Sequence, residues 1–265
     1  MPILNMANGP DINYVRTRAT GGVPIVFIHA LGLDLSVWEH QFEAFGGDHD
    51  LLAMDLPGHG RSGDLQQPPN FKAMAQSVCD LLEHLHIAQA HLVGISVGGM
   101  IAQTLAVMAP QRIRSLILVA TSCTFPDAVR TILRERAQLV RAGGMKAVIP
   151  LHLDRWFPQA FRQKRPDVLD RLSKILLRQD SEFHAGMWDM VAELELHQDL
   201  ASLGCPAMVV AGALDMSASP EAGNVIVHQL PGATLHVMPG SGHFPQMEFP
   251  VEFNRLMRAF LQQTE

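Results

Sequence analysis

The chain has 265 residues, of which 48% are hydrophobic and only 17% are charged. The usual charged share is about 25%, so this composition indicates a large buried core and excludes a disordered chain. The net charge is −6, from 20 basic and 26 acidic residues. This acidic balance argues against binding to nucleic acid or to anionic membranes, because both need a basic excess.

The sequence predicts a reduced, cytoplasmic protein. Its three cysteines, Cys79, Cys123 and Cys205, are far apart and form no C-x-x-C pair. Neither a disulfide framework nor a thiolate zinc site is therefore expected. Residues 1–6 lack the basic region and the long apolar run of a signal peptide. No stretch approaches the roughly 20 apolar residues that a membrane-spanning helix needs.

The predicted elements begin with a β-hairpin, because the Asn-Gly-Pro-Asp turn at 8–11 separates short alternating runs at 3–6 and 12–18. Six further strands, expected to be buried on both faces, are predicted at 23–28, 51–54, 92–93, 116–120, 207–211 and 234–238. Apolar residues at helical spacing predict helices at 71–86, 98–108 and 251–261. This alternation predicts an α/β fold, with a mostly parallel central sheet and helices on both faces.

One segment breaks the alternation of strands and helices. Residues 122–197 contain helical patterns and no strand candidate, and they hold 12 of the 20 basic residues against 10 acidic ones. We expect a helical cap, inserted after the sixth strand into a core domain formed by residues 1–121 and 198–265. The cap is either a solvated helical layer or a lid over a site.

The sequence Gly-Ile-Ser-Val-Gly-Gly at 94–99 follows a strand candidate and opens a helix candidate. In that context the G-x-S-x-G pattern predicts a nucleophile elbow, which lifts the Ser96 hydroxyl clear of the backbone at a helix N-terminus. The alternative is a glycine-rich phosphate loop, but no lysine follows in the loop. Ser96 is therefore the expected nucleophile.

A serine hydroxyl needs a base, and the base needs a carboxylate that orients it. His243, between a Gly turn and a Pro turn, is the expected base, and Asp215, just past a strand, is the expected carboxylate. The chain order Ser, Asp, His is that of the α/β-hydrolase fold. The backbone N–H groups of Leu31 and Val97 are the expected oxyanion-hole donors.

With these motifs the chain resembles the α/β-hydrolase family over nearly its whole length, and within that family it is most similar to 3-oxoadipate enol-lactonases. The family motifs lie at 29–32, 55–62, 94–99, 215 and 242–243. The likeness to enol-lactonases rests on 31–38, 96–103, 155–158, 212–215 and 219–220. The resemblance implies that Ser96, Asp215 and His243 are the catalytic serine, acid and histidine.

The predicted function is a serine hydrolase that cleaves a small carboxylic ester or lactone with water, through an acyl-enzyme on Ser96. It requires no cofactor or metal, binds no nucleic acid or membrane, and is a monomer or a homodimer. Alternatives with the same triad are a C–C bond hydrolase and a cofactor-free perhydrolase. A less favoured alternative is a non-catalytic ligand receptor on this fold.

Two arginines and several large apolar side chains are the expected residues of the substrate pocket. Arg134 and Arg155 could bind a substrate carboxylate through a bidentate pair, or they could lie on the solvated surface of the cap. The apolar candidates are Trp38, Met100, Trp156, Trp188 and Phe244.

Overall fold

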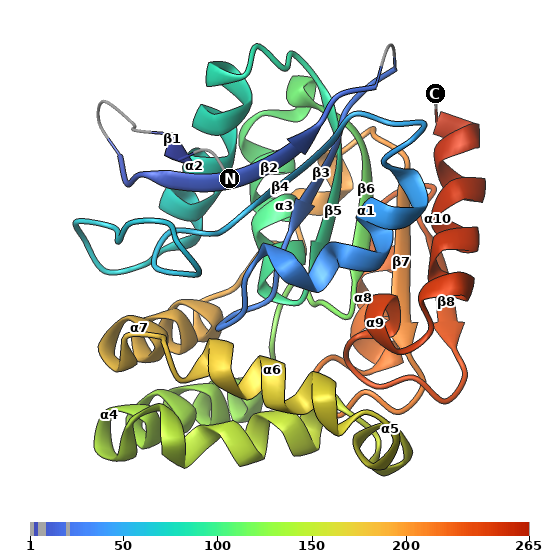
Figure 1. Ribbon diagram of the computed structural model, residues 1–265. Helices are drawn as coiled ribbons and strands as arrows, with labels where there is room; N and C mark the ends of the chain where they lie inside the picture. The colour runs from blue at the N-terminus through green and yellow to red at the C-terminus, as the bar shows by residue number, and fades with distance from the viewer. Residues whose placement is uncertain (1–2, 5–8, 20–21, 265) are drawn as a thin grey trace.

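The computed structural model describes residues 3–4, 9–19 and 22–264. Its centre is an eight-stranded sheet in the order β1-β2-β4-β3-β5-β6-β7-β8 (Figure 1). Strands β3 to β8 run parallel, whereas β2 pairs antiparallel with both β1 and β4. The strands are β1 Ile3–Leu4, β2 Ile12–Thr17, β3 Ile25–Ile28, β4 Leu51–Met54, β5 Ala90–Ile95, β6 Ile113–Val119, β7 Ala207–Gly212 and β8 Thr234–Met238.

The first two strands form the expected antiparallel pair. Ile3 lies opposite Asn13, and Leu4 lies opposite Ile12. The end of the first predicted run and the start of the predicted turn, at 5–8, lie outside the described residues.

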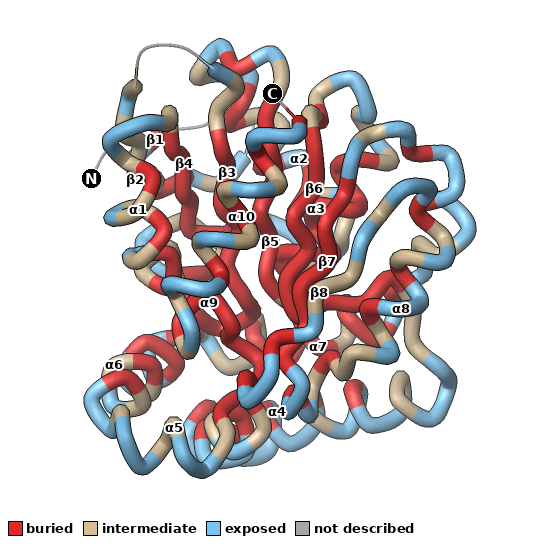
Figure 2. The backbone as a smooth tube through the Cα atoms, turned by 90° about the vertical axis from the view of Figure 1, so that its right-hand side faces the viewer, coloured by how far each residue is buried: buried red, intermediate tan, exposed pale blue. Residues whose placement is uncertain are grey.

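Burial distinguishes the centre of the sheet from one of its edges. Every residue of β3, β4, β5 and β7 is buried, and in β6 only Arg114 is partly exposed. Strands covered on both faces bury nearly all their side chains, as in other parallel sheets. The expectation of full burial is wrong for β8, where only Met238 is buried. Because β8 is the outermost strand, only β7 lies beside it (Figure 2).

Helices cover both faces of the sheet. Helices α1 (Glu39–Phe45) and α10 (Pro250–Thr264) lie on one face, and α2 (Phe71–His84), α3 (Val97–Met108) and α8 (Pro220–Gln229) lie on the other (Figure 1, Figure 2). The predicted helices correspond to α2, α3 and α10. Helices α1, α8 and the short α9 (Pro245–Glu248) were not predicted from the sequence.

Four helices stand between β6 and β7 in the chain and lie across the carboxyl ends of the parallel strands (Figure 1). They are α4 Asp127–Trp156, α5 Gln159–Lys164, α6 Pro166–Leu176 and α7 Ser181–Ala192. Helix α4 is bent at Gly144, whose φ of 65° and ψ of −175° are not helical. All four fall within 122–197, the range of the predicted cap.

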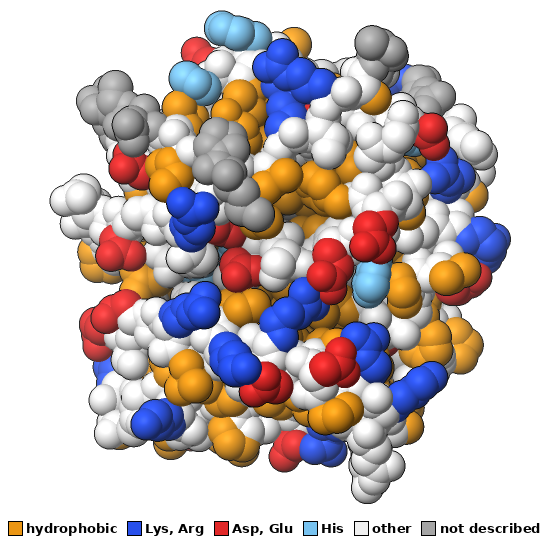
Figure 3. All heavy atoms as spheres, viewed as in Figure 1, with side chains coloured by type: hydrophobic (Ala, Val, Ile, Leu, Met, Phe, Trp, Pro, Cys, Tyr) orange, Lys and Arg blue, Asp and Glu red, His pale blue; other side chains and the backbone are white. Residues whose placement is uncertain are grey.

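The outer surface of these helices carries both signs of charge, with blue and red side chains intermixed in the lower part of Figure 3. Arg141 pairs with Glu182, and Arg165 pairs with Asp167. Exposed pairs of this kind stabilise a fold by only about 0–1 kcal/mol each. Among the described residues, no helix is long and apolar enough to cross a membrane.

Candidate active site

Ser96 lies on a sharp turn between β5 and α3. Its φ of 54° and ψ of −120° fall outside the regions that non-glycine residues ordinarily adopt. The turn is tightly packed, because a Cβ on Gly94 would lie 2.4 Å from the Gly98 carbonyl oxygen, and a Cβ on Gly98 would lie 2.2 Å from that of Ile28. Glycine is therefore required on both sides of the serine. Such a strained backbone costs about 1–3 kcal/mol and persists only where the surrounding structure holds it.

The two expected oxyanion donors lie beside Ser96. Leu31 and Val97 both line the same cavity as the serine. Val97 is the first residue of α3, so its N–H has no partner within the helix. An N–H at a helix N-terminus also carries the positive end of the helix dipole, which favours a developing negative charge.

His29 controls the direction of the Leu31 N–H. Its Nε2 accepts the N–H of Leu56 at 2.9 Å, so its Nδ1 carries the proton and donates to the Ala30 carbonyl at 2.8 Å. Burial lowers the pKa of His29 to about 4, so the ring is neutral at pH 7. The Ala30 carbonyl and the Leu31 N–H belong to one planar peptide unit and point in opposite directions. Holding the carbonyl therefore fixes the donor.

Asp215 and His243 come from the loops after β7 and β8 and form a buried pair. Asp215 Oδ2 lies 2.8 Å from His243 Nδ1, and the two side chains are 0% and 3% exposed. Asp215 Oδ1 accepts the N–H groups of Ser217 and Ala218 at 2.7 and 3.1 Å. An ionised carboxylate only accepts hydrogen bonds, so Nδ1 donates and Nε2 remains available as an acceptor.

The last residues of α4 contact the loop that carries His243. The His243 N–H donates to the Trp156 carbonyl at 2.7 Å. The indole of Trp156 also stacks on the imidazole, with ring centroids 6.4 Å apart. A Cβ on Gly242 would lie 2.4 Å from the same carbonyl oxygen. Only glycine therefore fits before the histidine while this contact is made.

These groups open into one cavity of about 260 Å³ beneath α4 and α7. Ser96 and His243 both line it, and so do four of the expected pocket residues, Met100, Arg155, Trp156 and Trp188. A second group of apolar residues in the wall was not expected from the sequence. It consists of Phe125, Val129, Ile132, Leu133 and Val191.

Three of the expected pocket residues do not line this cavity. Trp38 is fully buried and packs against Phe27, with ring centroids 5.1 Å apart. Phe244 is also fully buried in the core. Arg134 lies on the surface and pairs with Glu193 at 2.6 Å. Helical neighbours point in different directions, and the phase of α4 turns Arg134 away from the cavity.

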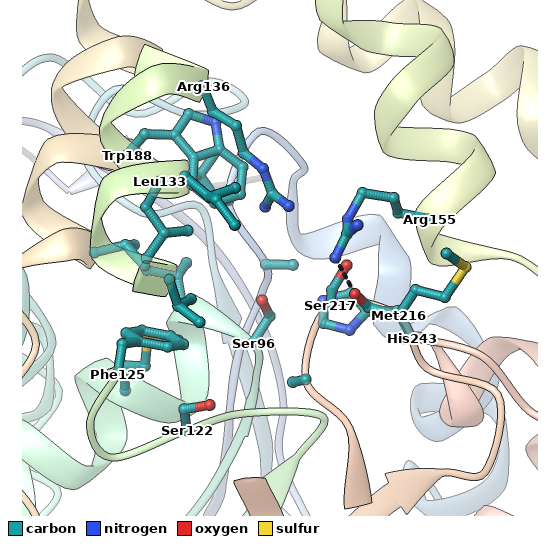
Figure 4. Close-up of a pocket in the computed structure, with 18 of the residues that line it drawn as sticks. Ser96, Ser122, Phe125, Leu133, Arg136, Arg155, Trp188, Met216, Ser217 and His243 are labelled. Carbon is teal, nitrogen blue, oxygen red and sulfur yellow. Dashed lines mark hydrogen bonds between the residues drawn. The ribbon is translucent and has the colours of Figure 1, made fainter. Parts of the chain in front are cut away.

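Arg136, two residues further along α4, takes the place expected for Arg134. It and Arg155 direct their guanidinium groups into the space above Ser96 (Figure 4). Burial and the charge of Arg155 lower the pKa of Arg136 to about 10, so it remains protonated at pH 7. Arg136 lies over the Trp188 ring, and Arg155 donates to the Met216 carbonyl. Within residues 3–4, 9–19 and 22–264, neither arginine has a carboxylate partner.

Two buried histidines of the cap adjoin this wall. His152 stacks on Trp156, with ring centroids 5.1 Å apart, and His184 Nε2 accepts the Trp188 indole N–H at 3.2 Å. Burial, with the nearby charge of Arg136, lowers the pKa of His152 to about 3, so it is uncharged at pH 7. In the part of the chain that the structure describes, no three His, Cys, Asp or Glu side chains are placed to share a metal ion.

Comparison with known proteins gives the family. A family model for the alpha/beta hydrolase fold matches residues 23–250. The 3-oxoadipate enol-lactonase 2 of Acinetobacter baylyi is 30% identical, over 95% of this chain and 93% of its own. The enol-lactonase structure from Burkholderia xenovorans is 26% identical, with a TM-score of 0.90 over 98% of this chain and 100% of its own.

A further solved structure is the malate-bound thermophilic esterase from Thermogutta terrifontis. It is 25% identical, with a TM-score of 0.89 over 99% of this chain and 97% of its own. The predicted architecture is confirmed by these matches and by the mostly parallel eight-stranded sheet. The chain therefore belongs to the alpha/beta hydrolase fold family, and it is a hydrolase that resembles the 3-oxoadipate enol-lactonases.

Proposed function

We propose that the protein is a serine hydrolase that cleaves a small carboxylic ester or lactone through an acyl-enzyme on Ser96. The observation that carries this proposal is the lining of a single cavity by Ser96 and by His243, which is bonded to the buried Asp215. A fold by itself does not determine a reaction. The proposal therefore rests on these three side chains and on the strained turn that holds the serine.

In the first half of the proposed reaction, Ser96 Oγ attacks the substrate carbonyl carbon and His243 Nε2 takes the hydroxyl proton. Asp215 holds the imidazole in the required tautomer and stabilises the imidazolium that forms. The N–H groups of Leu31 and Val97 bind the oxyanion, and one such donor contributes roughly 3–4 kcal/mol to transition-state stabilisation.

Collapse of the tetrahedral intermediate breaks the bond between the carbonyl carbon and the leaving oxygen, which takes the proton from His243. An ester releases an alcohol at this point, whereas the opened ring of a lactone keeps its new hydroxyl on the acyl group. In the second half, His243 deprotonates a water that attacks the acyl-enzyme. The products are a carboxylic acid and free Ser96.

A fluorophosphonate probe and a series of p-nitrophenyl esters test this function together. We expect covalent labelling at Ser96 and faster turnover of the acetyl and butyryl esters than of the octanoyl ester. The reason is size, because a cavity of about 260 Å³ lies just below the roughly 300–1,000 Å³ of pockets that hold drug-sized ligands. Mass spectrometry locates the label, and initial rates rank the esters. An unlabelled Ser96 with no turnover of any ester or lactone would instead favour the ligand-receptor alternative.

We further propose that the substrate carries a carboxylate. Arg136 and Arg155 present two positive charges to the cavity without an acidic partner among the described residues. A guanidinium group binds a carboxylate strongly, through two parallel hydrogen bonds. The solved structure of the Thermogutta terrifontis esterase, which is 25% identical, has malate bound, and malate is itself a carboxylate. A short acyl group with an anionic end fits both the charge and the size of this cavity.

Replacing Arg136 with methionine should weaken the binding of anionic substrates selectively. We expect KM for the monoanionic p-nitrophenyl ester of succinic acid to rise by about 10- to 100-fold, because a buried hydrogen bond to a charged group is lost. KM for p-nitrophenyl acetate should change far less. Arg134→Met is the matched control, since that side chain lies outside the cavity. Equal changes for the anionic and the neutral ester would contradict a carboxylate site.

We propose a cytoplasmic location as well. The three cysteines are all free, and Cys123 is buried. Burial raises the pKa of its thiol to about 11, so it reacts slowly at neutral pH. Free thiols of this kind are usual in a reducing compartment. The proposed partners are a small ester or lactone and water.

A further inference from the structure

A second carboxylate lies beside the loop that carries His243. Glu248 is the last residue of α9, and its side chain turns back toward residues 241–244. Its Oε2 accepts the Gly242 N–H at 2.9 Å, and its Oε1 accepts the Phe244 N–H at 3.0 Å. The Ser241 hydroxyl donates to Oε1 at 3.3 Å. One side chain thus binds three residues of a four-residue loop.

The two amides that Glu248 binds lie on either side of His243, whose own N–H donates to the Trp156 carbonyl. Three successive amides of the loop therefore have fixed partners that alternate between α9 and the end of α4. This arrangement restricts rotation of the backbone at His243. The direction of its Cα–Cβ bond, and with it the position of the imidazole, follows from the backbone geometry.

The charge of Glu248 also acts on the imidazole. The pKa of this carboxyl group lies above its usual value because burial is the largest effect, although the N–H groups of Gly242 and Phe244, the Ser241 hydroxyl and the nearby His243 lower it. A carboxylate that accepts backbone N–H groups is stabilised in its ionised form. Arg136 and Arg155 of α4 carry positive charge on the wall of the cavity that His243 also lines. The other titratable groups near its imidazole are Asp215 from the loop after β7, Glu248 from α9 and His152 from α4. Two of these three can carry negative charge.

We propose that Glu248 is a positioning residue for His243, which fixes the histidine loop through its backbone and stabilises the imidazolium formed during catalysis. This inference rests on the proposed serine-hydrolase function. Glu248 is not part of the cavity lining, so it acts through His243 and not through the substrate. Its removal should therefore lower kcat and leave KM nearly unchanged.

Glu248→Gln tests the proposal, with p-nitrophenyl acetate as substrate. The amide keeps the shape of the side chain, but it loses the charge and places a donor in front of a backbone N–H. We expect kcat to fall by about tenfold or more, as the loss of one charged hydrogen bond implies. The acid limb of the kcat profile should move to lower pH, because a neutral imidazole is favoured when a negative charge is removed. The downfield proton NMR signal of the His243 Nδ1–H should shift or broaden.

Glu252→Gln is the matched control, because Glu252 is exposed on α10 and pairs with Arg255. It should retain the kcat, the pH profile and the NMR signal of the wild type. A folded Glu248→Gln protein with all three wild-type properties would overturn the inference. If that variant does not fold, Glu248→Asp, which retracts the carboxylate by one methylene, takes its place. A reduced kcat in the folded Asp variant supports the proposal, and an unchanged kcat overturns it.

Measurements on the wild-type enzyme distinguish a failure of the Glu248 proposal from a failure of the serine-hydrolase proposal on which it rests. If fluorophosphonate does not label Ser96 in the wild type, the serine-hydrolase proposal fails and the Glu248 proposal fails with it. If the wild type is labelled and hydrolyses the ester, an undiminished Glu248→Gln variant defeats only the role of Glu248.

Discussion

Replacing Ser96 with alanine should reduce kcat by roughly 10⁴- to 10⁶-fold, because the variant has no nucleophile while the rest of the site remains in place. Alanine keeps the Cβ, so it adopts the backbone at φ 54° with no more steric strain than serine. The fold and the cavity should therefore survive. Initial rates with p-nitrophenyl esters measure the loss, and thermal unfolding verifies that the protein is folded.

Ser122→Ala provides the control for this experiment. Ser122 lines the same cavity and carries the same hydroxyl, but it is not on the turn between β5 and α3. We expect its kcat to stay within about tenfold of the wild type, the change that one ordinary hydrogen bond can cause. A Ser96→Ala protein as active as Ser122→Ala would exclude an acyl-enzyme on Ser96.

Asp215→Asn should lower kcat by about 10⁴-fold, because the asparagine stabilises the tautomer of His243 that cannot act as the base. The hydrogen bonds of Asp215 determine which way the new asparagine amide would point. Asp215 Oδ1 accepts two backbone N–H groups, from Ser217 and Ala218, so an asparagine must keep its oxygen there. Its NH₂ group then faces His243 Nδ1, which has to accept. The proton moves to Nε2, and Nε2 can no longer take a proton from the serine.

The tautomer can be observed directly. Nitrogen NMR of labelled histidine should show the proton of the neutral His243 imidazole on Nε2 in Asp215→Asn and on Nδ1 in the wild type. Asp199→Asn, on a short helical turn before β7, is a suitable surface control and should behave as the wild type. An Asp215→Asn protein with kcat within tenfold of the wild type would contradict the proposed role of the carboxylate.

Sequence alone predicts the position of Ser96, Asp215 and His243, because each residue follows a strand within a short local motif. The carboxyl ends of parallel strands meet at one edge of the sheet, so residues far apart in the chain become neighbours. Asp215 Oδ2 and His243 Nδ1 lie 2.8 Å apart at this edge. Their catalytic roles remain a prediction.

The pocket could not be predicted from residue type in the same way. Large apolar side chains fill cores as well as pockets, and Trp38 and Phe244 belong to the core. The periodicity of α4 distinguishes the two arginines, because Leu133, Ala137 and Val140 are buried on one face of the helix. Arg136 follows Leu133 at helical spacing, whereas Arg134 does not.

The contacts of Glu248 could not be predicted from the sequence for a different reason. Its partners are backbone N–H groups in a turn, and a sequence does not reveal which amides such a turn leaves without partners. Nothing in the residue types near position 248 distinguishes this carboxylate from the exposed acid four residues later. Only the three-dimensional path of the chain brings it beneath the histidine.

The bond from the His243 amide to the Trp156 carbonyl makes the inserted helices inseparable from the chemistry of the core. A shortened protein without them would leave that amide unpaired, at a cost of about 1–3 kcal/mol if it stayed buried. Glu248 would still hold the amides on either side of His243, but the loop would lose its contact with α4. The core therefore does not constitute a minimal enzyme. If these helices were exchanged between relatives to alter substrate choice, the hydrogen bond between the His243 amide and the carbonyl of residue 156 would have to be preserved.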